Sequence, residues 1–210
     1  LAPIEILPGP QSTPSGGPGT GAVIVLEPAA AGPGAPEGRA HARIGSFDTF
    51  SGGLAVRGTA SAFGYSASLA HDETDNFRPG NGSSNLSYTA RLGRSVLPQL
   101  LLGATLRGQD AAYDEIGSTL FIANGRAATL NHLGTVFAHW SPAATFASRL
   151  TAGWHQNEYH WTDRDFGPSA DFYFRNTRQV LDWQNTWDAS AHIRLVAGAN
   201  AEWSNHATTG

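Results

Sequence analysis

Several residue types that are common in soluble proteins are missing or scarce in this sequence. The 210 residues include no cysteine, methionine or lysine, so all 13 basic residues are arginine. The missing cysteine excludes disulfide bonds and cysteine-based catalysis. Charged residues make up 14% of the chain, well below the ~25% usual for a soluble domain. The net charge of −4 and the scattered arginines argue against a nucleic-acid partner, which needs a basic patch.

Long apolar runs are missing as well. No run approaches the ~18 residues of a transmembrane helix, and no signal peptide opens the chain. The low charge nevertheless suits a surface that faces lipid, where a charge costs about 2 to 4 kcal/mol at the bilayer midplane. Any membrane span must therefore be built from strands. Because the first residues already read as a strand, we expect the chain to be a fragment of a longer protein.

Apolar and polar residues alternate with a period of two along most of the chain, which is typical of strands with two different faces. The pattern is clearest in four stretches, residues 85–93, 99–107, 146–155 and 193–203. Weaker strands are expected at residues 39–46, 50–58 and 63–71. In all, the pattern predicts about nine antiparallel strands.

The arginines mark one face of these strands. When the apolar residues set the parity, five arginines fall on the opposite face: Arg57, Arg91, Arg107, Arg149 and Arg194. A soluble sandwich would expose such a face to water with many lysines, aspartates and glutamates. We therefore predict that these arginines face the lumen of a transmembrane β-barrel.

The connections between strands alternate in length. Short links are predicted at residues 59–62, 95–98, 141–144 and 189–191, and long ones at 72–84, 110–127 and 156–171. Outer-membrane barrels have short turns on one side and long loops on the other. The order therefore favours a partial barrel, with about nine strands of a larger one.

Aromatic residues divide between strand ends and predicted long loops. Four tryptophans fall near predicted strand ends, where they would form two interfacial belts: Trp140, Trp187, Trp154 and Trp203. Tyr113, Trp161, Phe172 and Tyr173 fall in or beside the predicted long loops. We predict that these four stack on a bulky ligand, with Tyr113, Trp161 and Tyr173 as the site residues.

Metal ligands are few. Asp72 and Asp75 lie in one predicted long loop and are the best candidates for a calcium site, although a solvated loop is the favoured interpretation. His155, Glu158 and His160 match no zinc motif, so they are interpreted as a polar rim. No cofactor is predicted apart from this possible calcium ion. No nucleophile elbow, phosphate loop or pair of placed carboxylates occurs, so we expect no enzyme.

The first 27 residues carry a family resemblance. The motif Ile4-Glu5-Ile6-Leu7-Pro8-Gly9-Pro10-Gln11-Ser12, followed by Gly21-Ala22-Val23-Ile24-Val25, resembles the end of the plug domain of TonB-dependent outer-membrane receptors. The matching plug positions are Ile4, Glu5, Gly9, Pro10, Ser12 and Gly21. Pro8 stands where the family usually has arginine. The resemblance implies a plug end at residues 1–27, a Pro/Ala/Gly linker at 28–38 and the first barrel strands at 39–210.

Two shorter matches, Arg43-Ile44-Gly45-Ser46-Phe47 and Asp182-Trp183-Gln184-Asn185, are similar to the vitamin B12 receptor branch. The resemblance implies an active transporter in the outer membrane of a Gram-negative bacterium. It also implies outer-membrane lipid and TonB as partners, and a small-molecule metal complex, cobalamin or a ferric siderophore, as the transported ligand.

Two other classes of protein remain open. A passive porin or an autotransporter β-domain explains the amphipathic strands equally well but leaves residues 4–25 unaccounted for. A soluble β-sandwich carbohydrate-binding module is a third possibility, against which the low charge and the loop order both count.

Overall fold

The computed structural model describes residues 4–8, 22–26, 35–116, 124–165 and 171–209. All regular structure in this part of the chain is strand, as the sequence predicts, and none of it is helical. The strands are β1 (Ile4–Pro8), β2 (Ala22–Leu26), β3 (Glu37–Gly45), β4 (Thr49–Ala60), β5 (Phe63–Thr74), β6 (Ser83–Leu97), β7 (Leu100–Ile116), β8 (Asn124–Ala143), β9 (Phe146–Asp163), β10 (Phe172–Ser190) and β11 (Ile193–Thr209).

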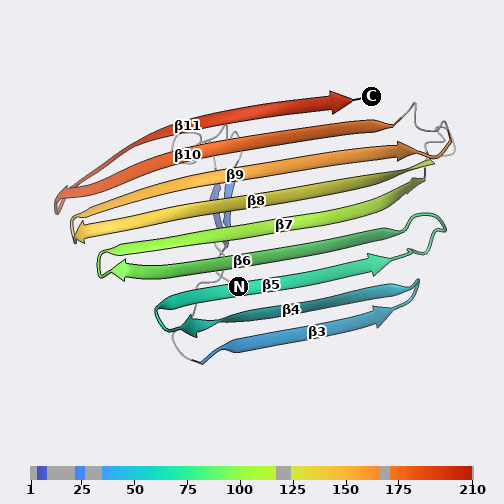
Figure 1. The fold of residues 1–210 in the computed structure, drawn as a ribbon, viewed down its shortest axis with the longest axis horizontal. Coiled ribbons are helices and arrows are strands. Elements are labelled where there is room, and N and C mark those ends of the chain that lie inside the picture. The colour runs from blue at the N-terminus through green and yellow to red at the C-terminus, as the bar shows by residue number, and fades with distance from the viewer. Residues whose placement is uncertain (1–3, 9–21, 27–34, 117–123, 166–170, 210) are drawn as a thin grey trace.

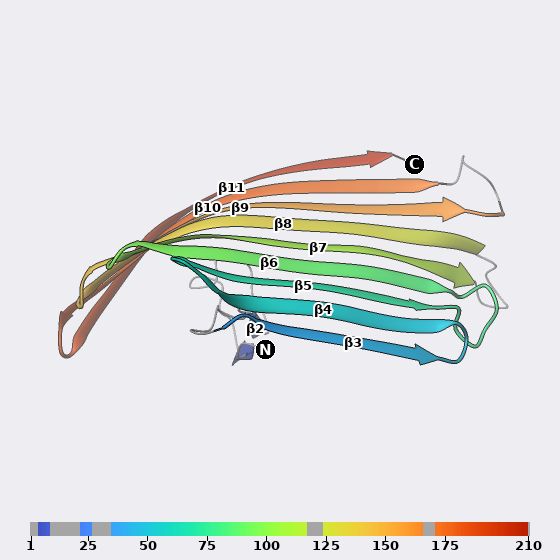
Figure 2. The ribbon, with the colours of Figure 1, turned by 60° about the horizontal axis from the view of Figure 1, so that its bottom comes forward.

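Strands β3 to β11 form one antiparallel sheet in which every strand pairs with its neighbours in the chain (Figure 1). This confirms the predicted nine strands. The sheet is open, with β3 and β11 at its two edges, and it is twisted and curved (Figure 2). β1 and β2 pair separately, with Ile4 opposite Leu26. Figures 1 and 2 place this hairpin behind the sheet face that is turned to the viewer in Figure 1.

The sheet has almost no core. Among the described residues only Gly58, Gly125, Ala127, at 0% exposure, and Asp163, at 8%, are buried. The accessible surface is 14028 Å² for a chain of 22.1 kDa, whereas a compact protein of that mass exposes roughly 9,300 Å². A single layer of strands has nothing of its own to cover its apolar side chains. Something other than this sheet must cover them.

The strand ends alternate between short and long connections, as predicted. Two-residue links at 61–62, 98–99, 144–145 and 191–192 lie at one end of the sheet. The other end, called the rim below, carries the turn at 46–48, the connection 75–82 and the strand ends that flank residues 117–123 and 164–171. At 46–48 the chain reverses through two residues with positive φ, Phe47 at 60° and Asp48 at 49°, as a tight hairpin turn requires.

The predicted boundaries of the long connections are wrong. They were expected at 72–84, 110–127 and 156–171, but β5, β7, β8 and β9 continue well into these ranges. Near the rim both faces carry polar residues, so the period-two pattern fades although the backbone ladder continues. β3 likewise begins at Glu37, inside the predicted linker. The rest of that linker, up to residue 34, lies outside the described residues.

Candidate functional site

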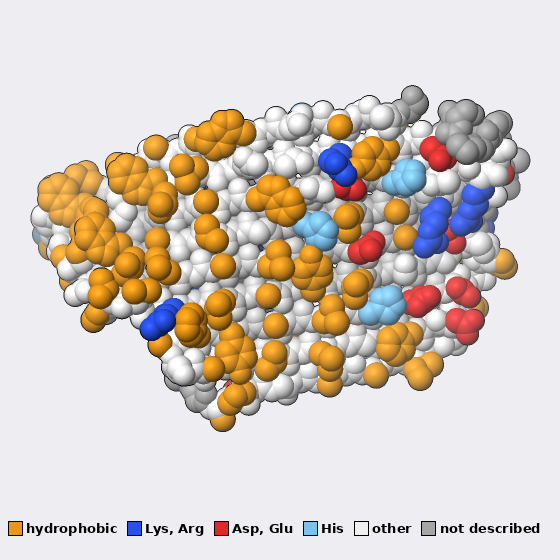
Figure 3. Space-filling model, viewed as in Figure 1, with side chains coloured by type: hydrophobic (Ala, Val, Ile, Leu, Met, Phe, Trp, Pro, Cys, Tyr) orange, Lys and Arg blue, Asp and Glu red, His pale blue; other side chains and the backbone are white. Residues whose placement is uncertain are grey.

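One face of the sheet is apolar and exposed. The ladder pairs Leu54 with Leu69 and Ala104 with Val136, and it puts Leu181 on the same face through Ala152. This is the apolar face, and Figure 3 shows hydrophobic side chains spread over most of it. Leu54 is 62% exposed and Val136 59%. Large apolar patches on a surface normally mark a contact with a partner or with a membrane.

The apolar face excludes charge only within a band. Going towards the rim, the first charged residues are Glu73 in β5, Asp110 in β7, Arg126 in β8, Glu158 in β9 and Arg175 in β10. Charged side chains gather at that end in Figure 3. At the opposite end Arg94 stacks over the Phe63 ring at 4.9 Å. Charge is therefore excluded from the band and not from the whole face, because the strands extend beyond their apolar stretch.

The four tryptophans expected at strand ends all lie on the apolar face. Trp140 and Trp187 lie near the short links, and Trp140 contacts Phe146 with the ring centroids 6.2 Å apart. Trp154 and Trp203 lie on the same face, nearer the rim. Each of the four is at least 37% exposed. This placement brings aromatic side chains to both limits of the band.

The opposite, polar face carries the five arginines predicted to line a lumen. The ladder puts Arg57, Arg91, Arg107, Arg149 and Arg194 on this face. Arg57 pairs with Glu37 at 2.6 Å, Arg194 pairs with Asp188 at 2.5 Å, and Arg91 stacks over Phe137 at 5.4 Å. That these arginines line a lumen stays a prediction.

An aromatic platform lies at the rim end of the polar face. It consists of Tyr113 in β7, Tyr159 and Trp161 in β9 and Phe172 in β10, and the ladder aligns Tyr113, Trp161 and Phe172 across the sheet. The Tyr159 and Phe172 ring centroids are 6.3 Å apart, and Tyr159 shares a side-chain hydrogen bond with Tyr113. Tyr113 is 41% exposed and Phe172 40%. The platform therefore offers aromatic surface to any molecule on this side of the sheet.

Small residues of β8 make room for the platform. Ala127, between Tyr113 and Trp161, is completely covered. A β-carbon at Gly125 would lie 2.6 Å from Trp161 Cε2, so the indole crosses over this glycine. The indole Nε1 donates a hydrogen bond to Glu115 Oε2 at 3.2 Å. Burial, together with the neighbouring Tyr113 and the Glu115 carboxylate, raises the pKa of Tyr159.

An amide row crosses the polar face four residues further from the rim. It consists of Gln109, Asn131, Asn157 and Asn176, which are successive partners across β7 to β10. Asn157 Nδ2 donates to Asn131 Oδ1 at 2.6 Å, and Gln109 Nε2 donates to Asn85 Oδ1 at 2.8 Å. Each amide carries both a donor and an acceptor, so the row presents mixed hydrogen-bonding groups in a line.

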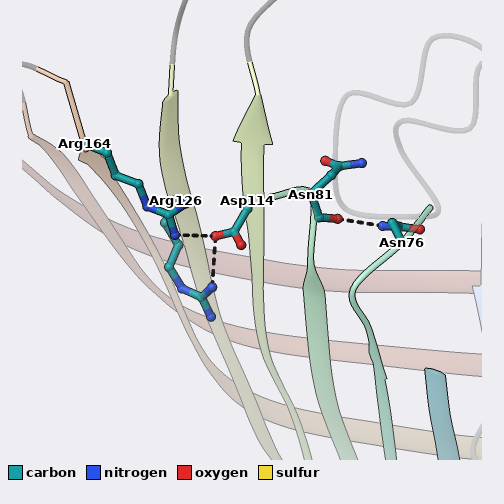
Figure 4. Close-up of polar contacts among 5 residues, drawn as sticks. All are labelled: Asn76, Asn81, Asp114, Arg126 and Arg164. Carbon is teal, nitrogen blue, oxygen red and sulfur yellow. Dashed lines mark hydrogen bonds and ion pairs between the residues drawn. The ribbon is translucent and has the colours of Figure 1, made fainter. Parts of the chain in front are cut away.

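Another polar cluster ties the rim together on the apolar-face side. Asp114 Oδ1 pairs with Arg126 at 3.1 Å and with Arg164 at 2.7 Å (Figure 4). The Asp114 side chain is only 16% exposed. Asn76 Nδ2 donates to the Asn81 carbonyl at 2.7 Å within the 75–82 connection (Figure 4). The cluster thus links β7, β8 and the residue after β9, which stabilises the rim.

The four predicted ligand-binding aromatics are split by the structure. They do not lie in loops; Tyr113 lies in β7, Trp161 in β9, and Phe172 and Tyr173 in β10, so their secondary-structure prediction is wrong. Tyr113, Trp161 and Phe172 belong to the platform, whereas Tyr173 lies on the other face, 6.2 Å from the His160 ring centroid. Tyr159 was missed, although it lies two residues before Trp161 and so shares its face.

The remaining predicted sites are only partly described. Asp72 lies in β5 on the polar face and Asp75 in the connection that follows. In the part of the chain that the structure describes, no three His, Asp or Glu side chains are grouped to hold a metal ion, and the calcium site stays a prediction. Of the plug motif, Ile4 and Glu5 lie in β1. Gly9, Pro10, Ser12 and Gly21 lie outside the described residues.

No family model matches the chain, and no curated protein matches it. None of the described residues forms a helix of the length and apolarity needed to cross a membrane.

Proposed function

We propose that this chain supplies nine neighbouring strands of an outer-membrane β-barrel, and that the barrel is a TonB-dependent active transporter. The observation that carries the proposal is a single sheet layer whose exposed apolar face is free of charge in a band across it. Lipid is the cover that such a band fits, and the open edges at β3 and β11 would pair with further strands to close the barrel.

The height of the band supports this assignment. On β11 the apolar face runs from Ile193 to Trp203 without a charge. These residues span about 33 Å along the strand at ~3.3 Å per residue. With the ~45° tilt of barrel strands this becomes roughly 23 Å, close to the ~25 Å apolar band of outer-membrane barrels.

The choice of a transporter rests on the residues before the sheet. The resemblance of residues 4–25 to a plug end favours a plugged receptor over an open pore. The hairpin β1–β2 lies on the polar-face side of the sheet, where a plug would lie inside a barrel. TonB would be the energy-coupling partner, and the resemblance favours cobalamin or a ferric siderophore as the bulky ligand, with calcium as a further candidate ion.

A passive porin or autotransporter domain is the alternative, because the same band would serve it equally well. The full-length gene product should fractionate with the outer membrane, migrate differently on a gel before and after heating, and conduct little steady current in a planar bilayer. A large steady conductance would favour the porin. Monodisperse behaviour without detergent would exclude the barrel itself and favour a soluble sandwich.

A further inference from the structure

We propose that the aromatic platform and the amide row together form a binding site for an oligosaccharide. The inference rests on the proposed function, because it treats the polar face as an inner wall reached from outside. It differs from the proposed function in the ligand: the platform and the amide row are proposed to bind a sugar chain, and not cobalamin or a ferric siderophore.

The platform has the chemistry that a sugar ring needs. The faces of aromatic rings are electron-rich, so they attract the weakly positive C–H groups of a pyranose. Tyr113 and Phe172 expose 41% and 40% of their surface. Ala127, which lies between Tyr113 and Trp161, is completely covered, so no ligand fits between the aromatic rings and the sheet. A ligand must therefore stack from the polar-face side.

The amide row supplies the second half of the site. Sugar hydroxyls both donate and accept hydrogen bonds, and so do the side-chain amides of Gln109, Asn131 and Asn157. Trp161 and Asn157 are four residues apart on β9 and lie on the same face, which places them about 13 Å apart along the strand. A single sugar ring does not span that distance, whereas a short oligosaccharide does.

The charges at the platform disfavour a polyanionic ferric complex. The charged side chains beside Trp161 are Glu115, which accepts its indole N–H at 3.2 Å, and the buried Asp163. Arg178 on β10 and Arg107 on β7 each lie two residues beyond the amide row, away from the platform, and Arg178 is paired with Glu202 at 2.6 Å. Carboxylates repel an anionic ligand and accept hydrogen bonds from a hydroxylated one.

The test is a binding titration of the purified full-length protein with cello-, malto-, xylo- and chito-oligosaccharides of increasing length, followed by calorimetry. We expect at least one series to bind, with the trimer or a longer chain binding more tightly than the monosaccharide. Trp161→Ala and Asn157→Ala should each weaken binding about tenfold. Gly125→Ala should also weaken it, because the new β-carbon displaces the indole.

Tyr173→Ala is the matched control, because this tyrosine lies at the same level on the other face and its loss should leave the affinity unchanged. Cyanocobalamin and ferrichrome are titrated in parallel. The inference is overturned if no oligosaccharide binds to the folded protein, if Trp161→Ala leaves sugar affinity intact, or if cyanocobalamin or ferrichrome is the ligand whose affinity depends on Trp161. Failure to insert into a membrane, with Trp161-dependent sugar binding retained, would instead overturn the proposed function alone.

Discussion

Adjacent residues in β10 provide a direct comparison of the two faces. Leu181 lies on the apolar face beside Ala152 and is 42% exposed, whereas Val180 lies on the polar face between Gly153 and Glu202. The change to arginine is nearly the same at both positions, since each replaces one aliphatic side chain in the same strand. Only the environment that receives the charge differs.

If lipid covers the apolar face, Leu181→Arg should lower the free energy of unfolding by about 1 to 3 kcal/mol, because the cost of arginine is largest at the bilayer midplane and Leu181 lies two residues inside the limit of the band. That is roughly a 5- to 160-fold change in the folding equilibrium. Val180→Arg should cost less than about 1 kcal/mol, since the new guanidinium meets water, the small Gly153 and the Glu202 carboxylate. If water covered both faces, both variants would fall in the lower range.

The assay is equilibrium unfolding in urea of the full-length protein folded into phospholipid vesicles. Folded and unfolded fractions are read from tryptophan fluorescence and from gel mobility without heating. A difference of at least ~1 kcal/mol between the two variants supports the assignment of the faces. Equal effects, or a larger cost for Val180→Arg, would refute it.

Three further predictions concern individual contacts. Asp114→Ala removes the shared partner of Arg126 and Arg164 and should lower the free energy of unfolding in urea by about 1 to 2 kcal/mol. Asp110→Ala, on the same strand and face, is the control. An equal cost for both variants would show that the ion pairs of Asp114 do not stabilise the fold. Gly108→Ala would overlap the Tyr88 ring and break its 2.7 Å hydrogen bond to His132, at a cost of about 1 kcal/mol. Adding Tyr88→Phe to this variant should cost little more, because the hydrogen bond is already lost. Fully additive costs of the two substitutions would show that Gly108→Ala does not act through this hydrogen bond. Glu115→Gln should lower the pKa of Tyr159, as followed by tyrosinate absorbance, because a nearby negative charge is lost. The folded state raises the pKa of Tyr159 above 10.0, so the protein loses free energy of unfolding as the pH rises through 10.0 and beyond. Glu115→Gln should reduce this loss of stability. An unchanged Tyr159 pKa in Glu115→Gln would show that the Glu115 carboxylate does not raise it.

The strands and their faces could be predicted because the apolar band imposes a period of two. Of the predicted stretch 99–107, for example, residues 100–107 lie in β7, and the stretch 193–203 lies in β11, where every second side chain falls on the apolar face. Parity also placed Arg91 and Arg149 on one face before any pairing was known. A one-residue error in register would have moved every one of these side chains to the other face.

The rim could not be predicted in the same way. Beyond the band both faces carry polar residues, so periodicity does not reveal that β7 continues to Ile116 or β9 to Asp163. The platform also depends on pairing between strands far apart in sequence: Tyr113 and Trp161 meet only because Ala127 of β8 lies between them. Tyr173 looked equivalent in sequence and lies on the other face.

Single-cysteine labelling along β10 tests the central claim most directly, because the chain has no cysteine of its own. A fluorophore is attached in turn at each position from 180 to 185 in the vesicle-inserted protein, and its quenching by lipid-borne and water-soluble quenchers is compared. We predict that positions 181, 183 and 185 are quenched from the lipid and that positions 180, 182 and 184 are not. Equal access of the water-soluble quencher to all six positions would contradict a membrane-facing apolar surface.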